Sequence, residues 1–290
     1  TNGRGGAFTY AIAAGSGSAT VNSSTGLIAG ISIGTVTLTV TSAGDTNYNV
    51  ATTSQLITIG KTTPVLTITS ANTLNVDGML TATVTTTATL GRGGAFTYAL
   101  VAGSGSATIN ASTGLITGIS IGTVTLTVTS AGDTNYNVAT TSQLITIGKT
   151  TPVLTITSAN TLNVDGALTA TVSTTATNGR GGAFTYTIAA GSGSVTINAS
   201  TGLITGISIG TVTLTVISAG DTNYNVAATS QLITIGKTTP VLTITSANTV
   251  NVDGTLTTTV STTATNGRGG AFTYALVAGS GSATINASTG

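Results

Sequence analysis

The side chains that could carry acid–base or metal chemistry in this chain are aspartates, because its 290 residues include no His, Cys or Glu. Asp45 and Asp77, and their later copies, stand beside Gly or Asn, where an Asp side chain commonly hydrogen-bonds the backbone of a turn. Catalysis needs a set of acid, base or nucleophilic groups, and calcium needs about 6–8 oxygen ligands, usually several of them carboxylates. Two Asp per repeat, such as Asp77 and Asp133, provide neither set. We therefore expect no catalytic residue, no metal site and no cofactor-binding residue.

Three further polar positions have two interpretations each. Arg92, in the glycine-rich loop 91–94, could bind a carboxylate or phosphate, or could cap carbonyls or pair with an Asp. One Arg per repeat does not make the basic stripe of a nucleic-acid-binding protein, so no nucleic-acid partner is expected. Lys61 could form an internal Lys–Asn isopeptide bond, but its place at a repeat boundary favours a solvated lysine. Asn110-Ala-Ser112 matches the N-glycosylation pattern, and the same residues suffice as a turn.

Internal repetition organises the whole chain. Gly-Arg-Gly-Gly begins at Gly3, Gly91, Gly179 and Gly267, a constant spacing of 88 residues. Residues 61–148 and 149–236 differ at nine of 88 aligned positions. A unit of this length has the size of a domain rather than of a solenoid repeat.

The composition indicates an all-β protein. Charged residues make up 4% of the chain, against about 25% in an ordinary soluble domain, and the β-favouring residues Thr, Val and Ile dominate. Without Cys the domains have no disulfides. No apolar run reaches the ~20 residues of a membrane-spanning helix, so this segment is not expected to insert into a membrane.

Residues 112–128 contain the clearest strand pattern. Val124, Leu126 and Val128 alternate with Thr, which is typical of a half-buried strand, and the glycine-bounded stretch 114–118 predicts a short strand paired with it as a hairpin. Asn75-Val76-Asp77-Gly78 predicts a turn with positive φ at Gly78. Together with the rest of the repeat, these patterns predict a seven-stranded Greek-key β-sandwich with strands over about 65–70, 80–87, 95–101, 107–109, 114–119, 122–130 and 142–147.

The predicted domains follow the repeat boundaries. Residues 61–148 and 149–236 each form a complete repeat, residues 1–60 a partial repeat, and residues 237–290 another partial repeat. In the complete repeat we expect a core containing Phe96, Tyr98, Val124, Leu126 and Val128. Tyr136 and its copies Tyr48 and Tyr224 should be buried, with each hydroxyl reaching a backbone group.

Two stretches resemble a known family. SATINASTGLITGISIGTVTLTV (106–128) resembles the second half of bacterial immunoglobulin-like domains of the intimin/invasin type. AGDTNYNVA (131–139) is similar to a loop before the last strand in tandem Ig-like repeats of very large secreted bacterial proteins. The resemblance implies Ig-like domains that act as non-enzymatic stalks or spacers of adhesins, outside the cell or on its surface.

The outward positions leave more than one function open. They carry threonine where Lys and Glu are usual, and such a near-neutral surface without charged edge strands favours self-association. The alternatives are an adhesin stalk, a fibre whose copies pack laterally or exchange strands, and a segment that binds ice or a crystalline polysaccharide. The outward threonines are Thr81, Thr83, Thr85, Thr123, Thr125 and Thr127.

The partial repeats predict a longer polymer. Residues 1–60 lack the first two strands of the repeat, and residues 237–290 lack its last strands. Residues 237–290 and 27–60 together span one repeat length, and residues 1–26 and 265–290 duplicate one another. We expect head-to-tail contact with further copies, either in one continuous polypeptide or by strand complementation between chains, since open sheet edges pair readily.

Overall fold

The computed structural model describes residues 6–89, 93–177, 181–265 and 270–290, and every regular element in them is a β-strand. The described chain divides into two compact units. The first contains residues as far as Thr150 together with Thr222–Tyr224, and the second contains Thr151–Asp221 with Asn225–Gly290. The predicted all-β sandwich class is confirmed.

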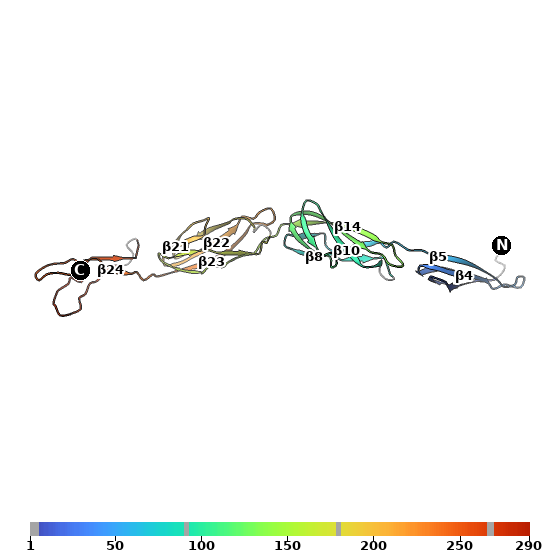
Figure 1. Ribbon diagram of the computed structural model, residues 1–290, viewed down its shortest axis with the longest axis horizontal. Helices are drawn as coiled ribbons and strands as arrows, with labels where there is room; N and C mark the ends of the chain where they lie inside the picture. The colour runs from blue at the N-terminus through green and yellow to red at the C-terminus, as the bar shows by residue number, and fades with distance from the viewer. Residues whose placement is uncertain (1–5, 90–92, 178–180, 266–269) are drawn as a thin grey trace. The chain divides into compact units, whose positions relative to one another are not determined.

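Residues 61–148 show the complete strand arrangement, in three sheets (Figure 1). One sheet has four strands in the order β10-β13-β14-β7, the second has three in the order β11-β12-β8, and β6 pairs with β9. The strands are β6 (Leu66–Ile68), β7 (Thr73–Asn75), β8 (Met79–Thr81), β9 (Val84–Thr86), β10 (Phe96–Ala102), β11 (Ser106–Ile109), β12 (Leu115–Ser120), β13 (Gly122–Ser130) and β14 (Ala139–Gly148).

The alternation of β13 places its apolar side chains in the core. Val124, Leu126 and Val128 are at most 1% exposed, and Ile116 of β12 is fully buried. In the second repeat the counterparts of these four residues belong to one hydrophobic cluster, so the two sheets pack face to face. The core prediction is confirmed for the three β13 residues, whereas Phe96 and Tyr98 are half-buried.

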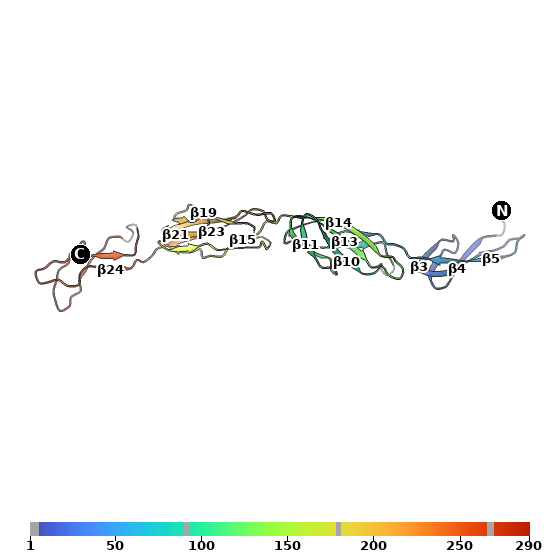
Figure 2. The same ribbon diagram turned by 45° about the horizontal axis from the view of Figure 1, so that its top comes forward.

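The predicted hairpin over 112–128 is wrong. β12 pairs with β11 and β8. β13 pairs instead with β10 and β14, which lie beside it in Figure 2. The chain crosses between the sheets at Gly122, whose φ is 128°. Each strand has one apolar face, and placing the strands in opposite sheets lets these faces cover one another.

Two other strand predictions need correction, and the described repeat has nine strands where seven are predicted. The strand expected over 80–87 is divided, because β8 pairs with β12 and β9 pairs with β6. The stretch before the 75–78 turn is a strand, β7, parallel to β14. In the turn itself Asp77, not Gly78, has positive φ, at 61°. Gly78 is needed for close approach, since a Cβ there would lie 2.9 Å from the Asn75 carbonyl oxygen.

The other parts of the chain repeat this arrangement in whole or in part. In residues 149–236 all nine strands recur with the same pairing. Residues 6–60 contain counterparts of β10 to β14, and the described residues of 237–290 contain counterparts of β6 and β9. These strands are β15 (Leu154–Ile156), β16 (Thr161–Asn163), β17 (Ala167–Thr169), β18 (Val172–Thr174), β19 (Phe184–Ala189), β20 (Ser194–Ile197), β21 (Leu203–Ser208), β22 (Gly210–Ser218), β23 (Ala227–Gly236), β1 (Phe8–Ala14), β2 (Ser18–Val21), β3 (Ile28–Ser32), β4 (Gly34–Ser42), β5 (Ala51–Ile59), β24 (Leu242–Ile244) and β25 (Val260–Thr262).

Candidate functional site

The loop 131–139, with its copies 43–51 and 219–227, is called the join loop below. Its shape follows from local chemistry. The Asp133 carboxylate accepts hydrogen bonds from the backbone N–H groups of Asn135 and Tyr136, at 2.8 and 2.9 Å. This is the Asx turn that an Asp followed by polar residues favours. Gly132, with φ 71°, leaves room for the Tyr136 carbonyl, which would lie 2.8 Å from a Cβ. The turn presents Asn135 and Tyr136 at fixed positions.

The tyrosine of the join loop differs among its copies. Tyr136 is 8% exposed, and its hydroxyl accepts a hydrogen bond from the Thr89 backbone N–H at 3.0 Å, as predicted. Tyr224 is fully buried, and its hydroxyl donates a hydrogen bond to the Asp77 carboxylate at 2.5 Å. Tyr48 is 51% exposed, so the prediction of burial is wrong there. The described residues 6–60 contain no counterpart of β6 or β9 beside Tyr48.

The asparagine of the join loop reaches the preceding repeat at the crossing between its sheets. The Asn223 side-chain oxygen accepts a hydrogen bond from the Ile121 backbone N–H at 3.2 Å. One repeat earlier, Asn135 makes the same contact with Ile33, at 3.1 Å. Sequence analysis missed both contacts, although the join loop and the crossing recur together in the chain.

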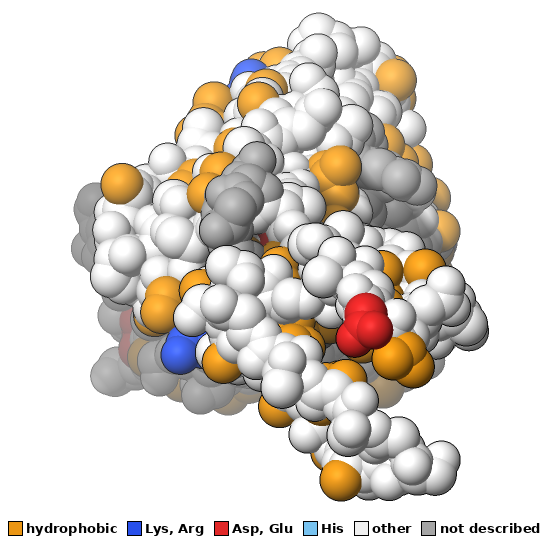
Figure 3. Space-filling model, turned by 90° about the vertical axis from the view of Figure 1, so that its left-hand side faces the viewer, with side chains coloured by type: hydrophobic (Ala, Val, Ile, Leu, Met, Phe, Trp, Pro, Cys, Tyr) orange, Lys and Arg blue, Asp and Glu red, His pale blue; other side chains and the backbone are white. Residues whose placement is uncertain are grey.

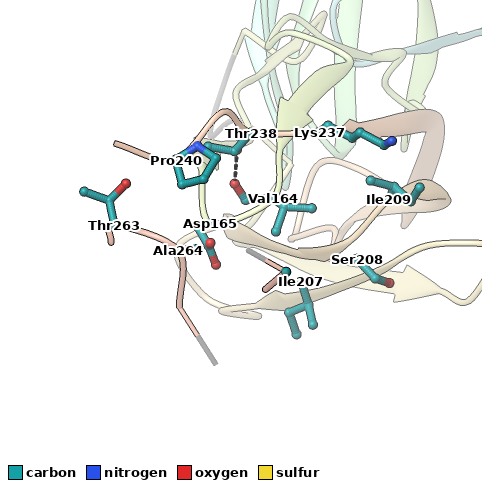
Figure 4. A pocket seen from close by; sticks show the side chains of 11 residues that line it. Val164, Asp165, Ile207, Ser208, Ile209, Lys237, Thr238, Pro240, Thr263 and Ala264 are labelled. Carbon is teal, nitrogen blue, oxygen red and sulfur yellow. Dashed lines mark hydrogen bonds between the residues drawn. The ribbon is translucent and has the colours of Figure 1, made fainter. Parts of the chain in front are cut away.

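A threonine that follows the repeat boundary adds a third contact. The Thr150 hydroxyl donates to the Val76 carbonyl, beside Asp77. The Thr238 hydroxyl does the same to the Val164 carbonyl (Figure 4). Asp77 therefore lies in a turn where its carboxylate and the neighbouring carbonyl both accept hydrogen bonds.

The backbone of this turn is strained in all three copies. Asp77, Asp165 and Asp253 have φ of 61°, 63° and 59°. A left-handed conformation costs an L-residue roughly 1–2 kcal/mol, and Gly or Asn is the usual occupant. Asp keeps the turn and supplies a charged acceptor, which makes a stronger hydrogen bond with a tyrosine hydroxyl than a neutral acceptor does.

The second copy of the turn borders a hollow of about 810 Å³. Asp165 accepts a hydrogen bond of 2.5 Å from the Thr265 hydroxyl. Figure 4 shows Asp165 near Ala264, with Pro240 and Thr238 on one side and Ile207 to Ile209 on the other. Ile209, the counterpart of Ile121, is 51% exposed.

The remaining candidates behave as structural groups where they are described. Lys61 is exposed and donates to the Asp133 backbone oxygen at 2.7 Å. The Asn110 side chain accepts hydrogen bonds from Ser112 and Thr113 N–H, both at 3.0 Å, which confirms the turn interpretation. Arg92 lies outside the described residues. Within residues 6–89, 93–177, 181–265 and 270–290, no three acidic, His or Cys side chains gather at a potential metal site.

The outer face of the sheet β10-β13-β14 is the second candidate surface. Thr97 pairs with Thr129, and Thr129 with Thr140, in a row across three strands. Leu144, 58% exposed, interrupts the pattern. In the second repeat the row becomes Thr185, Ile217 and Ala228. This row of threonines is therefore not kept from one repeat to the next, although Thr123, Thr125 and Thr127 recur as Thr211, Thr213 and Thr215.

The described part of the chain contains no helix of the length and hydrophobicity that a bilayer crossing requires. No protein-family model matches the sequence, and a search of curated proteins gives no match.

Solved structures with some similarity are multidomain β-proteins. The fibronectin(III)-like modules of Clostridium thermocellum CbhA have 13% identity and a TM-score of 0.24, over 60% of this chain and 95% of that one. Domains 4–9 of the surface layer protein SbsC have 15% identity and a TM-score of 0.24, over 84% of this chain and 42% of theirs. Cadherin-like domains 1 to 4 of zebrafish RET have 11% identity and a TM-score of 0.21, over 79% and 65%. At these TM-scores no function follows from the similarity.

Proposed function

We propose that this chain is a non-enzymatic structural segment of a bacterial extracellular fibre or surface stalk. Each 88-residue repeat is one Ig-like domain, so residues 61–148 and 149–236 are complete domains, and residues 1–60 and 237–290 are parts of domains. This role depends on the recurring hydrogen bonds of the join loop, such as those of Tyr224 and Asn223. Self-association extends the segment into a longer polymer.

The observation that carries this proposal is the contrast between the boundary residues and the outer face. The join loop is AGDTNYNVA in all three copies, and the strained turn is Asn-Val-Asp-Gly in all three. Of the nine differences between the complete repeats, four fall at outward positions of the four-stranded sheet. A spacer domain depends on the residues that contact its neighbours, and it tolerates substitutions on its outer faces. The four outward pairs are Ala99/Thr187, Val101/Ala189, Thr129/Ile217 and Thr140/Ala228.

The same contrast weighs against the alternative of a threonine face that binds ice or a crystalline polysaccharide. Matching a periodic surface requires a periodic array. Replacing Thr129 and Thr140 by Ile217 and Ala228 removes two hydroxyl groups from one row. Polysaccharide or cell-surface contact is therefore a secondary role of this segment.

A distance measurement across one join tests the proposal. The chain has no Cys, so the exposed Ser142 and Ser230, on the last strand of each complete repeat, can be replaced by Cys and spin-labelled. Pulsed electron paramagnetic resonance then reports the distribution of distances between the labels. We expect a narrow distribution, which Tyr224→Phe broadens by removing the hydroxyl that bonds Asp77.

Asp253→Ala is the matched control, because it alters the same turn at a copy that no join loop follows in this sequence. It should leave the distribution unchanged. A distribution that is already broad in the unmodified chain, or that Tyr224→Phe does not change, would contradict the proposal. It would mean that the Tyr224–Asp77 hydrogen bond does not fix the distance between consecutive repeats.

A further inference from the structure

Gln143 is a polar side chain on the inward face of the last strand of its repeat. It lies opposite Leu126 of β13, which is fully buried, and residues paired across two strands project from the same face of the sheet. Ile145 and Ile147, the next two residues on this face of β14, are at most 2% exposed. The Gln143 amide therefore enters the interior of the sandwich beside apolar side chains.

The chain crosses between sheets next to this amide. Ser70 follows β6, which pairs with β9, and precedes β7, which pairs with β14. Backbone groups in such a crossing leave the strand ladders and need other partners. The Gln143 side chain donates a hydrogen bond to the Ser70 carbonyl at 3.5 Å, and the Thr146 N–H donates to the Asn72 carbonyl at 2.9 Å. β14 thus meets part of the hydrogen-bonding demand of the crossing.

Two side-chain atoms at this crossing have no partner in the protein. The Ser70 Oγ and the Gln143 Oε1 are buried, and neither makes a hydrogen bond with a described residue. The same holds one repeat later for the Ser158 Oγ and the Gln231 Oε1. Within the described ranges, these two pairs are the buried side-chain N and O atoms that lack a partner. Because burying such atoms unpaired is unfavourable, we expect this position of the repeat to hold a hydrogen-bonding molecule.

The chemistry of the two atoms indicates which molecule fits. An amide oxygen only accepts hydrogen bonds, whereas a serine hydroxyl both donates and accepts. A water molecule satisfies both groups, because it can donate to the amide oxygen and accept from the hydroxyl. Buried waters in proteins typically make about three hydrogen bonds to polar groups that have no other partner.

An ion is a poorer occupant than water. Calcium takes about 6–8 oxygen ligands, usually with carboxylates among them, and no group of three acidic, His or Cys side chains gathers in the described residues. Charged residues make up only 4% of the chain, and Figure 3 shows few of them on the face that it views. A buried ion would therefore lack the counter-charge that its burial requires.

We propose that each complete repeat binds one internal water molecule at this crossing. The water lies between the Ser70 hydroxyl and the Gln143 amide oxygen in one repeat, and between Ser158 and Gln231 in the next. Together with the Gln143 amide it links the segment after β6 to β14, although β6 and β14 share no strand ladder. The site lies within a single repeat, so it goes beyond the proposed function and does not depend on it.

Nuclear magnetic resonance of the unmodified chain tests the site directly. The chain has Gln at positions 55, 143 and 231 alone, so selective labelling of glutamine gives a side-chain spectrum of these residues. Gln143 and Gln231 should each show a nuclear Overhauser effect from long-lived water. Such water gives cross-peaks of opposite sign in the laboratory-frame and rotating-frame experiments, whereas chemical exchange gives the same sign in both. Gln55, which is exposed, is the internal control and should show no such effect. No effect at Gln143, or an equal effect at Gln55, overturns the proposal.

Magnetic relaxation dispersion of the water oxygen nuclei counts the long-lived waters and gives a second readout. The double variant Ser70→Ala, Gln143→Leu removes both polar partners and should lower the dispersion amplitude by one water molecule. Adding Ser158→Ala and Gln231→Leu should lower it by one more. Ser142→Ala, at an exposed position of the same strand, is the matched control and should leave the amplitude unchanged. Circular dichroism checks that each variant is folded, and the measurement on the unmodified chain decides if one is not. A folded double variant with an unchanged amplitude, or an equal fall with Ser142→Ala, overturns the proposal.

Discussion

At the scale of single residues, Asp77 combines an unfavourable backbone conformation with a hydrogen bond to a residue far along the sequence. Gly would adopt this left-handed backbone conformation without strain, yet Asp stands in all three copies of the turn. Outliers of this kind persist where the surroundings use them. At Asp77 the carboxylate accepts a hydrogen bond from the Tyr224 hydroxyl.

Leu126 allows the core to be tested at one side chain. It is fully buried, and replacing it by Ala removes packed methyl groups and leaves a cavity. Leu126→Ala should lower the free energy of unfolding of its repeat by about 2–5 kcal/mol. Hydrogen exchange read by mass spectrometry distinguishes residues 61–148 from the near-identical repeat that follows. Leu144→Ala, at a side chain 58% exposed, is the control and should change exchange little. Equal effects of the two substitutions would contradict the assigned strand face.

Single residues also mark the limit of what sequence could predict. Alternation was enough to place Val124, Leu126 and Val128 inside, because side-chain direction in a strand is a local property. The Asx turn and the buried Tyr136 were predictable for the same reason. The bond between Tyr224 and Asp77 was not, because the two residues are 147 positions apart and no local pattern relates them.

At the scale of elements, the crossing from β12 to β13 decides the topology. Sequence patterns predicted both strands but paired them as a hairpin, since adjacent strands separated by glycine usually pair. Gly122 is the residue that prevents this pairing. At φ 128° it sends the chain into the other sheet, and a Cβ there would lie 2.4 Å from the Gly105 nitrogen.

Gly122→Ala should therefore destabilise the repeat strongly. The backbone conformation alone costs a non-glycine residue about 1–3 kcal/mol, and the contact with Gly105 adds to it. Chemical denaturation followed by circular dichroism measures the loss. Gly60→Ala is the matched control, because nothing lies within 4 Å of a Cβ at that position. A midpoint unchanged by Gly122→Ala would contradict the crossing.

At the scale of the whole molecule, the proposed fibre needs no bound ion. A metal that binds only the folded state at 100 times its Kd stabilises it by about 2.7 kcal/mol, so its removal would be visible. We expect the same Tm with and without excess chelator, measured by scanning calorimetry. A fall of many degrees would mean that carboxylates such as Asp77 or Asp133 hold a cation.

The parallel pairing of β7 with β14 determines how a repeat responds to being pulled. β7 lies near the start of the repeat and β14 at its end, with Thr73, Leu74 and Asn75 beside Thr146, Ile147 and Gly148. A force that draws residues 61 and 148 apart slides these strands along one another. Their hydrogen bonds run across the direction of sliding and bear the load together, whereas the bonds of an unzipping hairpin fail one after another. The pair is thus a mechanical clamp loaded in shear, placed where tension along a stalk would enter and leave each repeat.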